Sequence, residues 1–296
     1  MSNLKALKTR INSVKSTQKM TKAMKMVAAS RMKKAKTLVE TSRPYADKIE
    51  EMISQLASNV TAKKHINGNF PLLTGRSHNK THLIVVISSD RGLCGGLNGA
   101  AVKFTKNKIK ELKDQNREVY LFFIGKKAYE QLKGSYNNII INKVFDVFKN
   151  NIDYKIAQNI SDQLIELFEA NKFDVCEVIY SKFRSAIVQE QICKQIIPVQ
   201  ISHKNLEANK FQSPINYESS QEEILSELLP KNIMMQIYNE LLENNASEQG
   251  ARMAAMEAAT TNAGQMIKNL TLVYNRTRQA NITKELIDII SGANSV

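Results

Sequence analysis

The sequence predicts an α/β protein in which two long terminal helices pack as a coiled coil and flank a central domain with a mostly parallel sheet. Apolar and small residues recur at alternating steps of three and four near both chain ends, the spacing of a helix packed against a partner helix. Between the ends, short β-branched runs alternate with helical patterns, as in stacked βαβ units. Sixteen aromatic residues lie between Phe70 and Tyr217, so the main hydrophobic core is expected in the middle of the 296-residue chain.

The last helix is expected to run from about Lys231 to about Ser291, because Pro230 is the last proline and Gly292 stands where a helix C-cap would fall. A helix of this length measures roughly 90 Å, which exceeds the width of a small domain, so it requires a partner. The positions predicted to contact that partner are Met253, Met256, Thr260, Ala263, Ile267, Leu270, Tyr274 and Thr277.

The apolar pattern of this helix shifts after Thr277. The regular steps would reach Asn281, but the apolar residues resume at Ile282, Leu286 and Ile289. A stripe that moves around a helix no longer faces the same neighbour. The tip is therefore expected to leave the partner helix and to face another surface.

The first helix is expected to begin at once, since the sequence holds no proline before Pro44 and no glycine before Gly68. We expect Pro44 to kink or restart this helix and not to end it, because the helical pattern resumes from Ile49 to Leu56. A stable helical hairpin without further partners would show the same periodicity. The predicted contact positions are Leu4, Leu7, Ile11, Val14, Gln18, Thr21, Met24, Ala28, Met32, Ala35 and Leu38.

The central domain is expected to be Rossmann-like. The predicted strands are 83–87, 119–124, 139–144 and 175–180, and the predicted helices are 97–114, 126–133 and 154–170. An extended segment, 186–199, is expected to pair antiparallel at the sheet edge. Polar or turn-rich stretches, 58–80 and 202–220, are expected to be connections. Three predicted domains result, with the bounds 1–57, 80–201 and 221–296.

Charge indicates an acidic partner. The chain carries a net charge of +14, and residues 1–43 hold twelve Lys and Arg residues against one acid, Glu40. A nucleic-acid-binding protein with a basic coiled-coil arm is the alternative interpretation. It is disfavoured because the first aromatic residue is Tyr45, so no stacking side chains interleave with these basic residues.

The sequence predicts neither a cofactor nor a metal site. Cys94, Cys176 and Cys193 are odd in number and far apart, which suggests neither a disulfide framework nor zinc ligands. No apolar run reaches the ~18 residues of a membrane span, and no signal peptide or organellar leader is recognised. A bacterial cytoplasmic setting is therefore expected, with a mature organellar chain as the alternative.

The glycine-rich loop from Gly92 to Gly99 follows the first predicted strand. Backbone amides at a helix start can bind phosphate, which would fit a nucleotide-dependent α/β enzyme. However, the glycine spacing matches neither dinucleotide nor P-loop motifs, and Asp90 would place a negative charge near the phosphate. We interpret the loop as a tight strand-to-helix turn, and no catalytic residue set is predicted.

Residue identities add a resemblance to the gamma subunits of F-type ATP synthases. The motifs that carry it are TQKMTKAMKMVAAS (17–30), SDRGLCG (89–95), EQGARMAAMEAAT (248–260) and YNRTRQANITKEL (274–286). They stand in the family's order and cover nearly the whole chain. The resemblance implies a non-catalytic central-stalk rotor, whose terminal helices form an antiparallel coiled coil inside a catalytic ring and whose middle forms a foot on the membrane sector.

The resemblance also implies partners and contact residues. The partners would be the alpha and beta subunits of the catalytic head, the epsilon subunit and the c-subunit ring, with one copy of this chain per complex and no nucleic acid. The complex would lie at the bacterial inner membrane, with this chain peripheral on the cytoplasmic side. The positions that match contacts with the catalytic ring are Lys22, Met24, Lys25, Arg278, Gln279 and Thr283, and those that match the foot are Asp90, Arg91, Tyr217 and Glu218.

Overall fold

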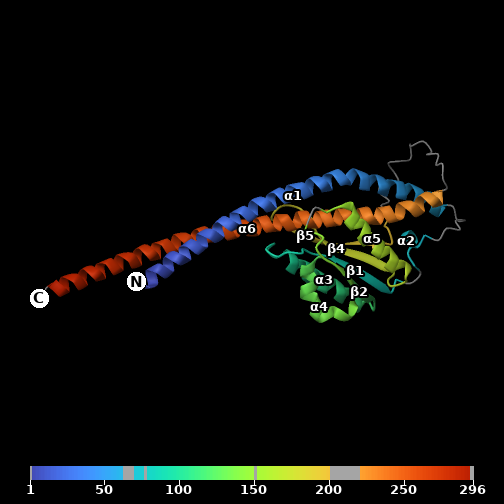
Figure 1. The fold of residues 1–296 in the computed structure, drawn as a ribbon. Coiled ribbons are helices and arrows are strands. Elements are labelled where there is room, and N and C mark those ends of the chain that lie inside the picture. Colours follow the sequence, from blue (N-terminus) through green and yellow to red (C-terminus); the bar gives the residue numbers. More distant parts are fainter. Residues whose placement is uncertain (1, 63–69, 77–78, 150–151, 201–220, 294–296) are drawn as a thin grey trace. The chain divides into compact units, whose positions relative to one another are not determined.

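A computed structural model describes residues 2–62, 70–76, 79–149, 152–200 and 221–293. The chain divides into two compact units, one made of Met1–Ala29 with Arg252–Val296 and the other of Ser30–Ala251. Two long helices, α1 (Ser2–Ala62) and α6 (Gln221–Ala293), contribute to both units (Figure 1). The division falls within these helices, and the domain bounds drawn from the sequence remain a prediction.

The larger unit contains a five-stranded sheet with the strand order β3-β2-β1-β4-β5. The strands are β1 (Thr81–Ile87), β2 (Glu118–Ile124), β3 (Ile140–Val144), β4 (Val175–Phe183) and β5 (Gln189–Ile197). β1 pairs in parallel with both β2 and β4, and β2 with β3, whereas β5 is antiparallel to β4. The predicted parallel sheet with one antiparallel edge strand is confirmed.

Helices cover both faces of this sheet (Figure 1). Side chains of β1 alternate between the faces: Ile84 and Val86 pack with α3 (Leu97–Asp114) and α4 (Lys126–Tyr136). Leu83, Val85 and Ile87 pack on the other face with α5 (Tyr154–Glu169) and with parts of α1 and α6. Two short helices, α2 (Pro71–Thr74) and η1 (Asn137–Ile139), complete the described elements.

Polar side chains of α6 hold the β4–β5 hairpin. The hydroxyl of Ser247 donates to the Ser181 carbonyl oxygen at 2.7 Å, and the Ser181 N–H donates to Asn244 Oδ1 at 3.2 Å. The N–H of Phe183 donates to Glu243 Oε2 at 3.1 Å. The middle of α6 therefore packs against the sheet and is not a solvent-exposed coiled-coil arm.

In the smaller unit α1 and α6 run antiparallel. The Lys25 ammonium forms an ion pair with Glu257, and the hydroxyls of Thr21 and Thr260 lie 2.7 Å apart. Gln18 Nε2 donates to the Thr260 carbonyl oxygen at 3.4 Å. The buried residues of this unit include Ile11, Thr21, Ala28, Met256 and Ala263. These residues belong to the predicted contact positions, which confirms the coiled coil in this part of the chain.

The predicted start of the last helix near Lys231 is wrong. The helix begins at Gln221, where the predicted domain 221–296 also begins, so Pro230 lies inside it, and it ends at Ala293, close to the expected end near Ser291. A proline removes one intrahelical hydrogen bond. Burial of Leu229 before the proline and of Ile233 after it in the hydrophobic core outweighs that loss. Pro44 also lies within a continuous helix, as expected.

One predicted contact position of the first helix is also wrong. Leu38 is 38% exposed, whereas Val39 and Ser42 are buried. The pattern continues from Ala35 by a step of four and then of three, because α1 here packs on the core of the α/β unit and no longer only along a partner helix. The helix face that is buried therefore changes between the two units.

Candidate partner-binding surfaces

The three residues of α1 that the sequence predicts as partner contacts lie in different environments. Lys22 is exposed, Met24 is half-buried, and Lys25 is half-buried and paired with Glu257. Lys25 therefore belongs to the contact between α1 and α6, whether or not it also meets another chain. Lys22 is directed to solvent and is available for a partner.

Three apolar residues of α1 were missed in the sequence analysis. Met20, Met26 and Val27 are 64%, 67% and 53% exposed. They fall outside the three-and-four spacing, and this was the signal that could have found them. An exposed cluster of large apolar side chains marks a surface that other molecules cover.

The tip of α6 exposes all three of its sequence-predicted contact residues. Arg278, Gln279 and Thr283 are exposed, and none of their side chains forms a hydrogen bond or an ion pair with another described residue. Thr277 and Asn281 remain half-buried, which continues the regular steps past the point where the apolar residues shift. The apolar residues that follow the shift are exposed and therefore face outward.

The same tip carries the largest run of exposed apolar side chains in the described chain. Its members are 49–67% exposed. They are Ile282, Leu286, Ile287, Ile289 and Ile290. A water-exposed helix of this composition is unfavourable unless a partner buries it.

Asp90 has a structural role that the sequence did not reveal. Its carboxylate accepts the N–H groups of Asp146 and Phe148, both at 3.0 Å. It thereby fixes the segment after β3 against the loop after β1. Arg91 next to it is exposed, while its carbonyl oxygen accepts the Ser89 hydroxyl at 2.6 Å. The other two foot residues, Tyr217 and Glu218, lie outside the described residues.

The glycine-rich loop forms the expected strand-to-helix turn. Asn98 Oδ1 accepts the Ser89 N–H at 3.2 Å, and Asn98 Nδ2 donates to the Cys94 sulfur at 3.1 Å. A Cβ added at Gly92, Gly96 or Gly99 would meet nothing within 4 Å. These glycines are therefore not required for close backbone approach, as they would be in a dinucleotide motif.

A partly buried charge cluster lies where β4 meets α3. Glu177 is 3.4 Å from His82 Nδ1 and 3.2 Å from Lys108 Nζ. Burial alone would raise the pKa of Glu177, but the His82 hydrogen bond and the Lys108 charge together lower it. Burial and the Glu177 charge raise the pKa of Cys193 to about 12, so this thiol is a poor nucleophile.

A second buried charge, Glu240 of α6, is almost fully enclosed. The residue is 2% exposed, and Lys194 Nζ of β5 lies 3.4 Å from Glu240 Oε1. Burial raises the pKa of Glu240 to about 7, because the attraction of the half-exposed Lys194 compensates only in part. In turn, burial and the Glu240 charge raise the pKa of Tyr180 and of the Cys176 thiol on β4.

Two negative findings apply to the described residues. No helix there has a stretch both long enough and apolar enough to span a bilayer. No group of His, Cys, Asp and Glu side chains there is arranged to hold a metal ion.

The paired-helix unit leaves apolar, basic and amide side chains uncovered, and the α/β unit shows none of the motif spacing of a nucleotide site. These features define a coiled-coil subunit of a larger assembly. Comparison with known proteins agrees with this class. The ATP synthase family model matches residues 3–296. The ATP synthase gamma chains of Rhodospirillum rubrum and Pelagibacter ubique are each 46% identical to this chain, and each alignment covers 100% of both proteins.

Solved structures give the same result. A chain in the central stalk and c-ring structure of the Tetrahymena thermophila mitochondrial ATP synthase is 28% identical, with a TM-score of 0.60 over 81% of this chain and 99% of that one. A rotor chain of the Euglena gracilis mitochondrial ATP synthase has a TM-score of 0.62 over 95% of this chain and 99% of that one, but at 17% identity it shows the fold alone.

The chain therefore belongs to the gamma-chain family of ATP synthases. Its role as the central-stalk rotor subunit, expected from the sequence, is confirmed, and nothing in the comparisons supports the nucleic-acid-binding alternative. As a gamma subunit it is a non-catalytic part of a membrane-associated enzyme complex.

Proposed function

We propose that this chain turns as a shaft in a bacterial F-type ATP synthase and performs no bond chemistry itself. It couples proton flow through the membrane sector to ATP synthesis and hydrolysis in the catalytic head, and it helps to regulate ATPase activity. The single observation that carries this proposal is the uncovered tip of α6, where Arg278 and Gln279 stand beside a run of exposed apolar residues. An isolated protein gains nothing from such a tip, whereas a surrounding ring of subunits buries it.

The catalytic ring is proposed to contact both helices of the smaller unit. Arg278, Gln279 and Thr283 on α6 provide polar contacts with a loop of the ring. On α1, Lys22 provides a polar contact and Met24 an apolar one, and Lys25 contributes positive charge beside its Glu257 partner. Alpha and beta subunits that present acidic side chains match the basic face of α1.

The α/β unit is proposed to form the foot. There the loop with Asp90 and Arg91, together with Tyr217 and Glu218, contacts the c-subunit ring, and the epsilon subunit binds the same unit. Because Asp90 holds the segment after β3, we propose that its part in the foot is to shape the loop, while the exposed Arg91 makes the contact. The chain would then be peripheral on the cytoplasmic side of the inner membrane.

Replacing Arg278 and Gln279 together by alanine is expected to lower ATP turnover of the assembled complex about tenfold. Interface contacts of charged and amide side chains contribute about 1 kcal/mol or more, and 1.4 kcal/mol corresponds to a factor of ten. Both residues are exposed, so folding should not change. ATP hydrolysis of purified complexes, compared at equal subunit composition, measures the effect.

The matched control replaces two exposed polar residues near the end of α3, Lys110 and Gln115, by alanine. This variant should keep the turnover of the unchanged complex. If the Arg278 and Gln279 variant assembles and turns over normally, the tip residues are ordinary solvated surface.

The smaller unit also predicts the copy number. Residues 2–29 carry seven basic side chains and no acidic one, whereas the part of α6 in this unit carries five basic and three acidic side chains. Self-pairing of two such basic helices would place like charges across the contact. We expect one copy for every three catalytic subunits, as measured by native mass spectrometry of the detergent-free head complex. Equal numbers of this chain and of the catalytic subunit would contradict the rotor function.

A further inference from the structure

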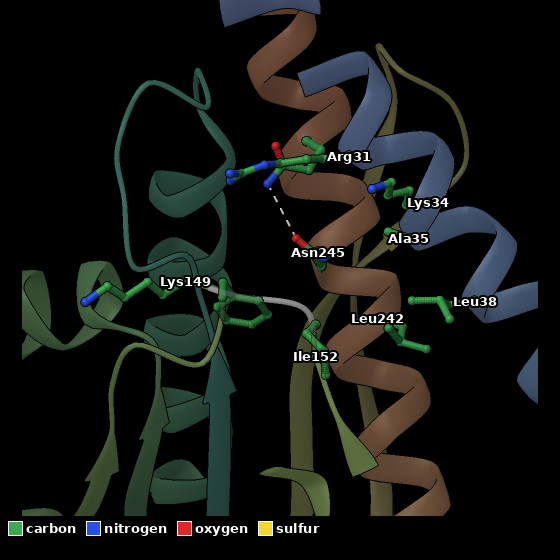
Figure 2. A pocket seen from close by; sticks show the side chains of 10 residues that line it. Arg31, Lys34, Ala35, Leu38, Lys149, Ile152, Leu242 and Asn245 are labelled. Carbon is green, nitrogen blue, oxygen red and sulfur yellow. Dashed lines mark hydrogen bonds between the residues drawn. The ribbon is translucent and has the colours of Figure 1, made fainter. Parts of the chain in front are cut away.

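A cavity of about 410 Å³ opens in the α/β unit between α1, α6 and the segment that follows β3 (Figure 2). This volume falls in the range of small-molecule sites, about 300–1,000 Å³. Neither the proposed shaft function nor its contact residues use this cavity. The chemistry of its lining indicates what it can bind.

Three cationic side chains line the cavity. Arg31 and Lys34 lie one turn apart on α1, whereas Lys149 lies on the segment after β3 and its ammonium points away from both helices (Figure 2). No acidic side chain lines the cavity, and none of the three cations forms an ion pair with a described carboxylate. Like charges one turn apart on a helix repel, so an anion beside Arg31 and Lys34 would be stabilising.

The floor of the cavity is apolar and recessed. Five of the ten lining residues are apolar, and three of these, Phe148, Ile152 and Leu242, are 7%, 4% and 0% exposed. Two amides of α6 form one wall, where Gln249 Nε2 donates to Asn245 Oδ1 at 3.4 Å (Figure 2). The site thus joins a cationic rim, an amide wall and an apolar floor.

We propose that this cavity binds a small organic phosphate monoester, with the phosphate at the rim and the apolar body on the floor. A phosphate dianion matches the two neighbouring cations Arg31 and Lys34, and the planar guanidinium of Arg31 can donate two parallel hydrogen bonds to it. An acidic side chain of a partner protein would satisfy the rim but would leave the recessed floor unfilled. The proposal does not depend on the shaft function.

The test is calorimetry of the full chain with phenyl phosphate, inorganic phosphate and phenol. Phenyl phosphate should bind at least about tenfold more tightly than inorganic phosphate, because only its ring reaches the floor. Phenol should not bind measurably. The methyl resonances of Ile152 and Leu242 should shift on addition of phenyl phosphate, which locates the ligand in this cavity.

Two variants test the rim. Replacing Arg31 and Lys34 together by glutamine should weaken phenyl phosphate at least about tenfold. The matched control is Lys33→Gln, because Lys33 is exposed on the same helix but does not line the cavity. It should bind as the unchanged chain does. Thermal unfolding of both variants checks that the fold is retained.

Several outcomes would overturn the proposal. Equal affinities for phenyl phosphate and inorganic phosphate would reduce the site to a plain anion contact. An unchanged affinity of the double variant for phenyl phosphate, or no binding by the unchanged chain, would show that this cavity does not bind phosphate monoesters. If the isolated chain bound phenyl phosphate but the assembled complex did not, a partner subunit would be the occupant of this cavity.

Discussion

Replacing Gly125 by alanine is expected to prevent the α/β unit from folding. Gly125 has φ +89° and connects β2 to α4, and its N–H donates to the Val144 carbonyl oxygen at 2.9 Å. An added Cβ would lie 2.0 Å from the carbonyl oxygen of Ser88. That oxygen belongs to the backbone directly after β1, the central strand of the sheet, so it cannot move aside without breaking strand pairing. We expect the free energy of unfolding to fall by more than about 4 kcal/mol.

The matched control for this variant is Gly134→Ala in α4. A Cβ at Gly134 would meet nothing within 4 Å, and the residue lies inside the helix. Alanine should stabilise the helix by about 0.5–1 kcal/mol. Soluble yield and the circular-dichroism melting curve of the full chain compare the two. A Gly125→Ala variant that melts like the unchanged protein would show that β1 and β2 can separate at their ends.

Most of the fold could be predicted because burial on both sheet faces leaves a simple pattern. The run Leu83 to Ile87 is apolar at every position, and all five residues are at most 1% exposed, which is typical of a central parallel strand. The edge strand β5 mixes polar and apolar residues, and the segment was accordingly expected at an edge. The local pattern of apolar and polar residues distinguishes a central strand from an edge strand, so it was sufficient to predict both.

The structure contains other features that depend on contacts between distant segments. Asp90 binds N–H groups that lie 56 and 58 residues further along the chain. No local pattern predicts such a contact, so the support that Asp90 gives to the loop was not foreseen, and its contact in the foot stays a prediction. The cavity beside Arg31 is built in the same way, from two helices and a loop. Of the predicted contact residues, the sequence could place those on helices, because helical spacing determines the face on which a side chain lies.

Glu240 shows the limit of reading charge from sequence. On a long helix between Asn239 and Leu241 it resembles a solvated glutamate, yet it is 2% exposed beneath β4 and β5. The polar and ionisable groups that face it are Lys194 on β5 and, through the field of its charge, Tyr180 and Cys176 on β4. The 3.4 Å separation from Lys194 is long for a charged hydrogen bond.

We expect Glu240→Gln to stabilise the α/β unit at pH 8. A carboxyl whose pKa rises from 4.5 to about 7 on folding holds its proton more tightly in the folded protein. Its contribution to stability is therefore full below about pH 4.5 and is lost as the pH rises toward 7. Once the Glu240 carboxyl is ionised, the free energy of unfolding is lower by about 3 kcal/mol. Glutamine keeps the shape without the charge, and Lys194 is exposed enough to be solvated.

The unchanged chain and the Glu240→Gln variant should therefore differ in stability only at pH values at which Glu240 is ionised. Denaturant midpoints of the full chain, measured by circular dichroism from about pH 4.5 to pH 8, should coincide at the acid end, and the glutamine variant should be more stable by about 1–3 kcal/mol at the alkaline end. Glu227→Gln is the matched control on the same helix, because the Glu227 side chain is 76% exposed. It should change the midpoint little at any pH. A glutamine variant that is less stable than the unchanged chain at pH 8 would mean that the ion pair with Lys194 outweighs the cost of burying the charge.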